Sequence, residues 1–142
     1  MRQELQQNLD EAETPCGTSK VLIFDEDIED LARAAEPFEA HGFEVHKCTT
    51  VEAAMRSIER EEFAFALVDQ GSPAFEGLRV IRHLARYNSP TPFVVVARRK
   101  EMVCCQQALA LGATDYLEKP VLRAELNLII KCYFGNSFNE MS

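Results

Sequence analysis

The chain has 142 residues, and its 15 Lys and Arg against 23 Asp and Glu give a formal net charge of −8. This length suits a single domain, and a composition of 46% hydrophobic and 27% charged residues is that of a folded globular protein, which excludes disorder throughout. The acidic balance argues against nucleic acid as a direct partner, and no apolar run approaches the roughly 20 residues of a membrane span.

We expect one ordered domain over residues 20–134, between a flexible polar leader at residues 1–19 and a loose tail at residues 135–142. Five short apolar segments of this domain are predicted to be strands, and a stretch with helical spacing follows each of them. The predicted strands are Val21–Phe24, Phe43–His46, Phe63–Val68, Phe93–Ala97 and Asp115–Leu117. The apolar positions that mark the five helices are Ile28, Leu31 and Ala35; Val51, Ala54, Met55 and Ile58; Leu78, Ile81, Leu84 and Ala85; Met102, Cys105 and Leu109; and Leu122, Leu126, Ile129, Ile130 and Tyr133.

Local signals mark where some of these helices begin and end. Asp27 is placed to cap the first helix, and Thr49 with Glu52 has the spacing of a capping box before the second. Gly112 stands where a glycine commonly follows the C-terminus of a helix, here the fourth. Five strands alternating with five helices predict an α/β fold, a doubly wound five-stranded parallel sheet covered by helices on both faces.

Charged residues follow three of the predicted strands. Asp25 and Glu26 come after the first strand, Asp69 after the third and Lys119 after the fifth. Open α/β sheets bind ligands beyond the carboxyl ends of their strands, and a strand order of 2-1-3-4-5 would bring these residues together. Three carboxylates in one cleft repel one another unless a cation intervenes, and an all-oxygen site suits Mg²⁺. With a lysine to balance an incoming anion, the set indicates phosphoryl chemistry.

At these residues the sequence resembles a known family. The segments KVLIFDED, LVDQGSPAFEG and GATDYLEKP are similar to the three signatures of the response-regulator receiver domain of two-component signalling. Their order and spacing agree with that family, because Asp69 follows Asp25 by 44 residues and Lys119 follows Asp69 by 50. The resemblance covers about residues 19–134 and implies a flavodoxin-like receiver fold with strand order 2-1-3-4-5.

The resemblance also implies a role for each of the charged residues. Asp69 would be the phosphoacceptor, taking a phosphoryl group from the phosphohistidine of a histidine kinase or phosphotransfer protein. Asp25, Glu26, Asp69 and the backbone carbonyl of Gly71 would hold Mg²⁺, and Lys119 would pair with the phosphoryl oxygens. Such a domain is a signalling module rather than an enzyme, and at most it catalyses its own phosphoryl transfer and dephosphorylation.

The sequence departs from the family at the positions that report phosphorylation. The family has Thr or Ser at the end of the fourth strand, where this chain has Ala97. Arg98 follows it and is either a cation over the acidic cleft or a solvated charge at the start of a helix. Tyr116 matches the family's switch aromatic. Because a hydrogen bond to a charged acceptor is worth roughly 1.5–3 kcal/mol, loss of the hydroxyl predicts an atypical switch.

Three other functions are alternatives to a phosphorylated receiver. A pseudo-receiver would use the same fold as an interaction module independent of phosphorylation; Ala97 and Arg98 favour it, and the retained acids oppose it. A haloacid dehalogenase phosphatase would use Asp25 as nucleophile and Asp27 as acid, but its later motifs are missing. A flavodoxin-like flavin binder would need a phosphate loop where this chain has acids.

The remaining expectations concern location and partners. Five cysteines without a CxxC pair argue against a disulfide framework or a zinc site. The beginning of the chain lacks a signal peptide, so we expect a cytoplasmic protein. The eight residues after 134 leave no room for an output domain, which predicts a stand-alone or excised receiver acting on a downstream protein. The face of the fourth helix, fifth strand and fifth helix is the expected surface for that target or for a homodimer.

Overall fold

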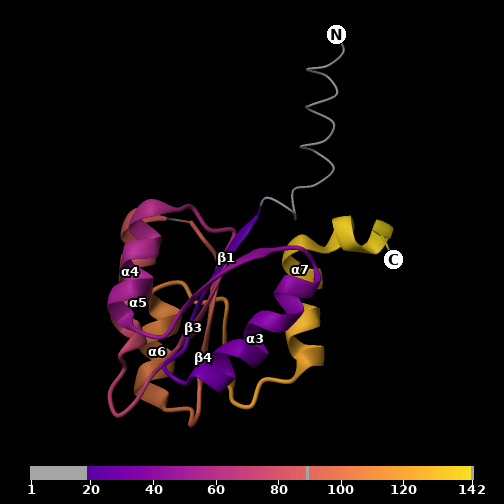
Figure 1. Ribbon diagram of the computed structural model, residues 1–142. Helices are drawn as coiled ribbons and strands as arrows, with labels where there is room; N and C mark the ends of the chain where they lie inside the picture. Colours follow the sequence, from indigo (N-terminus) through magenta and orange to yellow (C-terminus); the bar gives the residue numbers. More distant parts are fainter. Residues whose placement is uncertain (1–18, 89, 142) are drawn as a thin grey trace.

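The computed structural model describes residues 19–88 and 90–141, with side chains up to residue 135. In this part of the chain five strands alternate with five helices (Figure 1). The elements are β1 (Lys20–Phe24), α3 (Ile28–Ala40), β2 (Glu44–Cys48), α4 (Val51–Arg60), β3 (Phe65–Asp69), α5 (Gly77–Tyr87), β4 (Phe93–Ala97), α6 (Met102–Ala110), β5 (Asp115–Glu118) and α7 (Arg123–Met141). The predicted alternation of strands and helices is therefore confirmed.

The five strands form one parallel sheet in the order β2-β1-β3-β4-β5, which confirms the predicted topology. Every residue of β3 and β4 is buried, as expected for central strands covered on both faces. The register sets Phe24 beside Val68 and Asp69 beside Val96, so β1, β3 and β4 end at about the same level. The residues after these strands therefore share one edge of the sheet.

Two hydrophobic clusters lie on the two faces of the sheet. Side chains alternate along each strand, so Leu22 and Phe24 pack in one cluster while Val21 and Ile23 pack in the other. Helices α4, α5 and α6 cover the first face, and α3 and α7 cover the second (Figure 1). This arrangement holds the sheet between two helical layers and leaves its carboxyl edge uncovered for a site.

Local capping was predicted in part. Asp27 caps α3 by accepting hydrogen bonds from the backbone N–H groups of Glu29 and Asp30, which confirms that prediction. Gly112 has a φ of +106° just after α6, where a glycine was expected. The predicted capping box before α4 was wrong by one residue, because Thr50 accepts the bond from Ala53 and is the residue in the extended conformation.

The predicted apolar face of α6 was confirmed only at Cys105, which is half-buried and packs against the core. Met102 and Leu109 are exposed, as is Val103, and the buried side chains of the helix are those of Cys104 and Ala108. The positions of α6 that face the sheet are therefore occupied by small residues, and larger apolar side chains of the helix are exposed.

The C-terminal end of the domain lies further along the chain than expected. The last helix continues to Met141, past residue 134, where we expected the ordered domain to end. The predicted flexible leader lies outside the described residues, apart from Ser19. No helix in the described part of the chain is long and apolar enough to cross a membrane.

Candidate functional site

The predicted acids and lysine meet at the carboxyl edge of the sheet. Asp25 follows β1, Asp69 is the last residue of β3, and Lys119 follows β5. Asp69 Oδ2 accepts a hydrogen bond from the backbone N–H of Glu26 at 3.2 Å, which ties the end of β3 to the loop after β1. Both aspartates are buried, and Glu26 is exposed at the rim, where its carboxylate accepts a bond from the Ser72 amide.

Lys119 is the central cation of the site. Its Nζ lies 2.9 Å from Asp25 Oδ2, 3.1 Å from Asp30 Oδ2 and 3.2 Å from Asp69 Oδ1, and its side chain is only 9% exposed. One ammonium group thus neutralises part of the charge of three carboxylates. Removing it would leave the buried Asp25 and Asp69 carboxylates without their cation, while Asp30 would keep its pairs with Arg33 and Arg98. Leaving buried charges without a cation is far more costly than losing a surface pair.

The electrostatics of the site follow from burial and crowding. Burial raises the pKa of Asp25 from 3.8 to about 6, with the charge of Asp69 adding to the effect and Lys119 opposing it. Burial by itself would lower the pKa of Lys119, but its hydrogen bond to Asp25 and the charges of Asp69 and Asp25 outweigh it, so that pKa is raised. The site therefore holds a stable cation and a carboxyl that binds its proton unusually tightly.

A polar pocket of about 240 Å³ opens at this edge. It is lined by Glu26, Asp27, Asp69, Gly71, Ser72, Arg98 and Lys119. Two glycines shape the chain around it. Gly71 has a φ of +88°, which a residue with a side chain rarely adopts, and a Cβ on Gly77 would lie 2.1 Å from the main-chain oxygen of Asp69. Gly77 thus allows α5 to begin directly against the end of β3.

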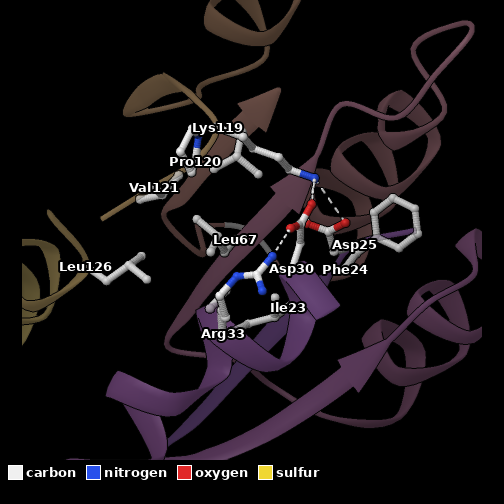
Figure 2. Close-up of a pocket in the computed structure, with 12 residues that line it drawn as sticks. Ile23, Phe24, Asp25, Asp30, Arg33, Leu67, Lys119, Pro120, Val121 and Leu126 are labelled. Atoms are coloured by element: carbon white, nitrogen blue, oxygen red, sulfur yellow. Dashed lines mark hydrogen bonds and ion pairs between the residues drawn. The ribbon is translucent and has the colours of Figure 1, made fainter. Parts of the chain in front are cut away.

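One carboxylate of the site was not predicted from the sequence. Asp30 lies in the first turn of α3 and pairs with Lys119, with Arg33 at 2.8 Å and with Arg98 at 3.4 Å. Figure 2 shows the Arg33 and Lys119 side chains directed at this carboxylate. The signal in the sequence was its position three residues after the cap Asp27, which places Asp30 at the end of the helix that faces the site.

Arg98 lies at the rim of the pocket. Its Nη2 is 3.4 Å from Asp30 and 3.6 Å from Asp27, and its side chain is 69% exposed. Arg98 is therefore in contact with acids of the site and also largely solvated. The sequence had offered these as alternatives, a cation over the acidic cleft or a solvated charge, and the structure has features of both.

The two switch positions are buried together. Ala97 ends β4 and belongs to the same hydrophobic cluster as Tyr116 of β5. The Tyr116 hydroxyl donates a hydrogen bond to Gln70 Oε1 and accepts one from the backbone N–H of Glu101 at 3.1 Å. Burial raises the pKa of Tyr116. Sequence reasoning missed Gln70, the residue directly after Asp69, whose side chain accepts the hydrogen bond from Tyr116.

The donor atoms of the site bear on whether it can hold a metal ion. In residues 19–88 and 90–141 no group of three or more His, Cys, Asp or Glu side chains is arranged to hold one. The carboxylates of Glu26 and Asp69 nevertheless supply oxygen donors in the wall of the pocket, and the buried Asp25 shares the Lys119 ammonium with Asp69. Burial raises the pKa of Asp25, and the charge of Asp69 adds to this effect. This chemistry fits Mg²⁺, which uses one or two carboxylates and keeps several waters.

Comparison with known proteins identifies the family. The model of the response regulator receiver domain matches residues 21–131, which is most of the chain. The protein therefore belongs to the receiver domain family of two-component response regulators. Within this family the chain is 26% identical over 113 residues to the regulatory protein AtoC of Escherichia coli, covering 80% of this chain and 24% of AtoC. It is 29% identical over 119 residues to the transcriptional regulatory protein PrrA of Mycobacterium tuberculosis, covering 84% of this chain and 51% of PrrA.

Solved structures agree with this assignment. A CheY-like receiver domain protein from Methanospirillum hungatei superposes with a TM-score of 0.76 at 26% identity, covering 87% of this chain and 98% of that one. A response regulator from Burkholderia pseudomallei, described with a phosphorylated aspartic acid, a calcium ion and citrate, gives 0.71 at 22% identity and covers 87% of this chain and 71% of that one. The protein thus spans a quarter to a half of the two curated relatives and nearly all of the first structure.

Proposed function

We propose that Asp69 is the phosphoacceptor of this receiver domain and takes a phosphoryl group from a histidine kinase or phosphotransfer protein. The observation that carries the proposal is the position of Asp69 in the wall of the 240 Å³ pocket, with its Oδ1 3.2 Å from the buried Lys119 ammonium. A carboxylate with an open approach on one side and a fixed cation beside it can bind and orient a phosphoryl group.

In the proposed step an oxygen of the Asp69 carboxylate attacks the phosphorus atom of a partner's phosphohistidine. The new O–P bond forms as the P–N bond breaks, the electron pair returns to the imidazole nitrogen, and Asp69 becomes an acyl phosphate. Lys119 supplies positive charge to the phosphoryl oxygens while they pass from the partner to Asp69. The backbone N–H of Glu26, 3.2 Å from Asp69 Oδ2, orients the carboxylate.

The acids of the pocket support a divalent cation in the same proposal. Asp25, Glu26 and Asp69, with the backbone carbonyl of Gly71, are the groups that would hold Mg²⁺. When bound, Mg²⁺ would offset the negative charge gathered on the phosphoryl group and the carboxylates. In its absence the buried Asp25 carboxyl has a pKa of about 6, so a cation beside it would favour the charged form.

The response to phosphorylation is proposed to be atypical. Ala97 has no hydroxyl to bind the phosphoryl group, and the guanidinium of the next residue, Arg98, lines the pocket and is proposed to replace it. Tyr116 is already buried and hydrogen-bonded at both sides of its hydroxyl. We expect the signal to depend on movement of Arg98 and Lys119 more than on rotation of Tyr116.

The downstream partner is proposed to be a protein that docks on α6, β5 and α7. Exposed apolar side chains at Met102, Val103 and Leu109 of α6 and at Leu128 of α7 support this surface. Met102→Lys would weaken binding of such a target, or of a second copy of the chain, and leave phosphorylation unchanged. Sedimentation with and without phosphodonor tests whether the occupant is a second copy.

One observation favours the second candidate, a pseudo-receiver that binds partners without phosphorylation. Lys119 Nζ already has three carboxylates within 3.2 Å, and Ala97 offers no hydroxyl. Intact-mass measurement after incubation with Mg²⁺ and acetyl phosphate separates the two functions. We expect one phosphoryl adduct on the wild type and none on Asp69→Asn, whose side chain keeps the size but loses the nucleophile. No adduct on either protein would favour the pseudo-receiver.

A further inference from the structure

Three cationic side chains converge on the carboxylate of Asp30. Its Oδ1 accepts a hydrogen bond from Arg33 Nη2 at 2.8 Å, and its Oδ2 lies 3.1 Å from Lys119 Nζ and 3.4 Å from Arg98 Nη2. Figure 2 shows Asp30 between Arg33 on one side and Lys119 on the other. The neighbouring cations outweigh the effect of burial and hold the pKa of Asp30 below its usual value, so it stays charged at neutral pH.

These contacts set up a competition for Lys119. An ammonium group has three N–H donors, and here Asp25, Asp30 and Asp69 each place an oxygen within 3.2 Å of it. A phosphoryl group arriving at Asp69 can bind Lys119 only if one of these carboxylates gives up its contact. The Asp30 side chain is 20% exposed, against 4% for Asp25 and 7% for Asp69, so water can solvate Asp30 most readily when it is released.

Arg98 is also paired with Asp30, but at a longer distance than Lys119. Its two ion-pair distances, 3.4 Å to Asp30 and 3.6 Å to Asp27, are both long, and the guanidinium lines the pocket that contains Asp69. Among the residues that the structure describes, Asp30 is the one carboxylate paired with both Lys119 and Arg98, the two cations that line the pocket. Asp30, Arg33 and Lys119 also line a cavity of about 50 Å³, whose lining side chains are drawn in Figure 2.

We propose that Asp30 is a positioning residue that restrains Lys119 and Arg98 in the unphosphorylated protein and competes with the phosphoryl group for both. The inference rests on Asp69 as the phosphoacceptor and deepens it by naming the group that sets how readily the site accepts an anion. Arg33 has the opposite effect, because it draws the Asp30 carboxylate away from Lys119.

The two variants Asp30→Asn and Arg33→Gln therefore change phosphorylation in opposite directions. Asp30→Asn keeps the size of the side chain and removes the competing charge, so the initial rate of adduct formation with dilute acetyl phosphate is expected to rise about fivefold. Arg33→Gln leaves Asp30 more strongly bound to Lys119, and the rate falls about twofold.

Glu29→Gln is the matched control. Glu29 is exposed, lies beside Asp30 in α3 and carries the same charge, so this variant reports the general effect of removing one negative charge near the pocket. A rate for Asp30→Asn equal to that of Glu29→Gln, or below the wild-type rate, overturns the proposal. A fall in rate with unchanged thermal stability would mean that Asp30 assists Lys119.

A second measurement does not need the covalent adduct. Inorganic phosphate is titrated into each protein while the backbone amide signals of Gly71 and Ser72, in the pocket wall, are followed by NMR. Asp30→Asn is expected to bind phosphate about fivefold more tightly than Glu29→Gln, even if no acyl phosphate forms. Equal affinities would overturn the competition, whereas absence of an adduct with unequal affinities would overturn only the role of Asp69 as phosphoacceptor.

Discussion

The raised pKa of Asp25 makes a specific prediction for stability. Asp25→Asn replaces the buried carboxyl by a neutral amide of the same shape, whose oxygen can still accept the hydrogen bond from the Asp27 amide at 2.9 Å. The pKa of Asp25 is 3.8 in the unfolded chain and about 6 in the folded protein. At about 1.36 kcal/mol per pKa unit, ionising this carboxyl lowers the free energy of unfolding by about 3 kcal/mol. We therefore expect Asp25→Asn to be more stable than the wild type at pH 7 by about 1–3 kcal/mol.

The sign of the pH dependence follows from proton binding. Between about pH 4 and pH 6 the folded wild type binds more protons at Asp25 than the unfolded chain, so its free energy of unfolding falls as pH rises through this window. Asp25→Asn lacks this fall, and the two proteins converge in stability below about pH 4. The lowered pKa of Asp30 acts at lower pH and is shared by both proteins, so the difference between them isolates Asp25.

Urea unfolding of both proteins from pH 4 to pH 7, without divalent cations, measures this difference. Adding Mg²⁺ at pH 7 should then stabilise the wild type by about 2.7 kcal/mol at a concentration 100 times the dissociation constant, and the Asn variant much less. A variant that is less stable than the wild type at pH 7, with the same pH profile, would refute the reasoning that buried charge at Asp25 opposes folding.

Three further substitutions test the packing around the site by urea unfolding. Gly77→Ala places a Cβ 2.1 Å from the main-chain oxygen of the last residue of β3 and should cost about 2 kcal/mol or more, whereas Gly135→Ala, with open space around it, should cost nothing; equal effects would contradict this. Tyr116→Phe leaves the buried Gln70 amide oxygen without its donor and should cost about 1–2 kcal/mol. Lys119→Met leaves three carboxylates without their shared cation and should cost about 3 kcal/mol in the absence of Mg²⁺; an unchanged midpoint would show that the ion pairs are weak.

The architecture and the main residues of the site were accessible from the sequence because both depend on local patterns. Strand-like runs at intervals predict a parallel sheet, and in such a sheet the residues after the strands share an edge. Asp25, Asp69 and Lys119 could therefore be brought together without knowing any distance, although they are separated by up to 94 residues.

The errors and omissions depend on packing that no local pattern records. The exposed side chains of Met102 and Leu109 have helical spacing, but the sheet accepts the smaller Cys104 and Ala108 on the opposite face of α6. Asp30 was missed because an acid in the first turn of a helix is usually solvated, and its interaction with the helix dipole is enough to explain its position. Only the position of the loop after β5 brings the Lys119 ammonium within 3.1 Å of it.

The central claim, that Asp69 accepts the phosphoryl group, is tested most directly by locating the adduct. The protein is incubated with Mg²⁺ and acetyl phosphate, digested under acidic conditions that preserve acyl phosphates, and its peptides are sequenced by mass spectrometry. We predict that the phosphoryl group is found on the peptide that contains Asp69. A phosphoryl group on Asp25 or Asp27, or one that persists in Asp69→Asn, would contradict the account and would instead favour the phosphatase-like use of the acids after β1.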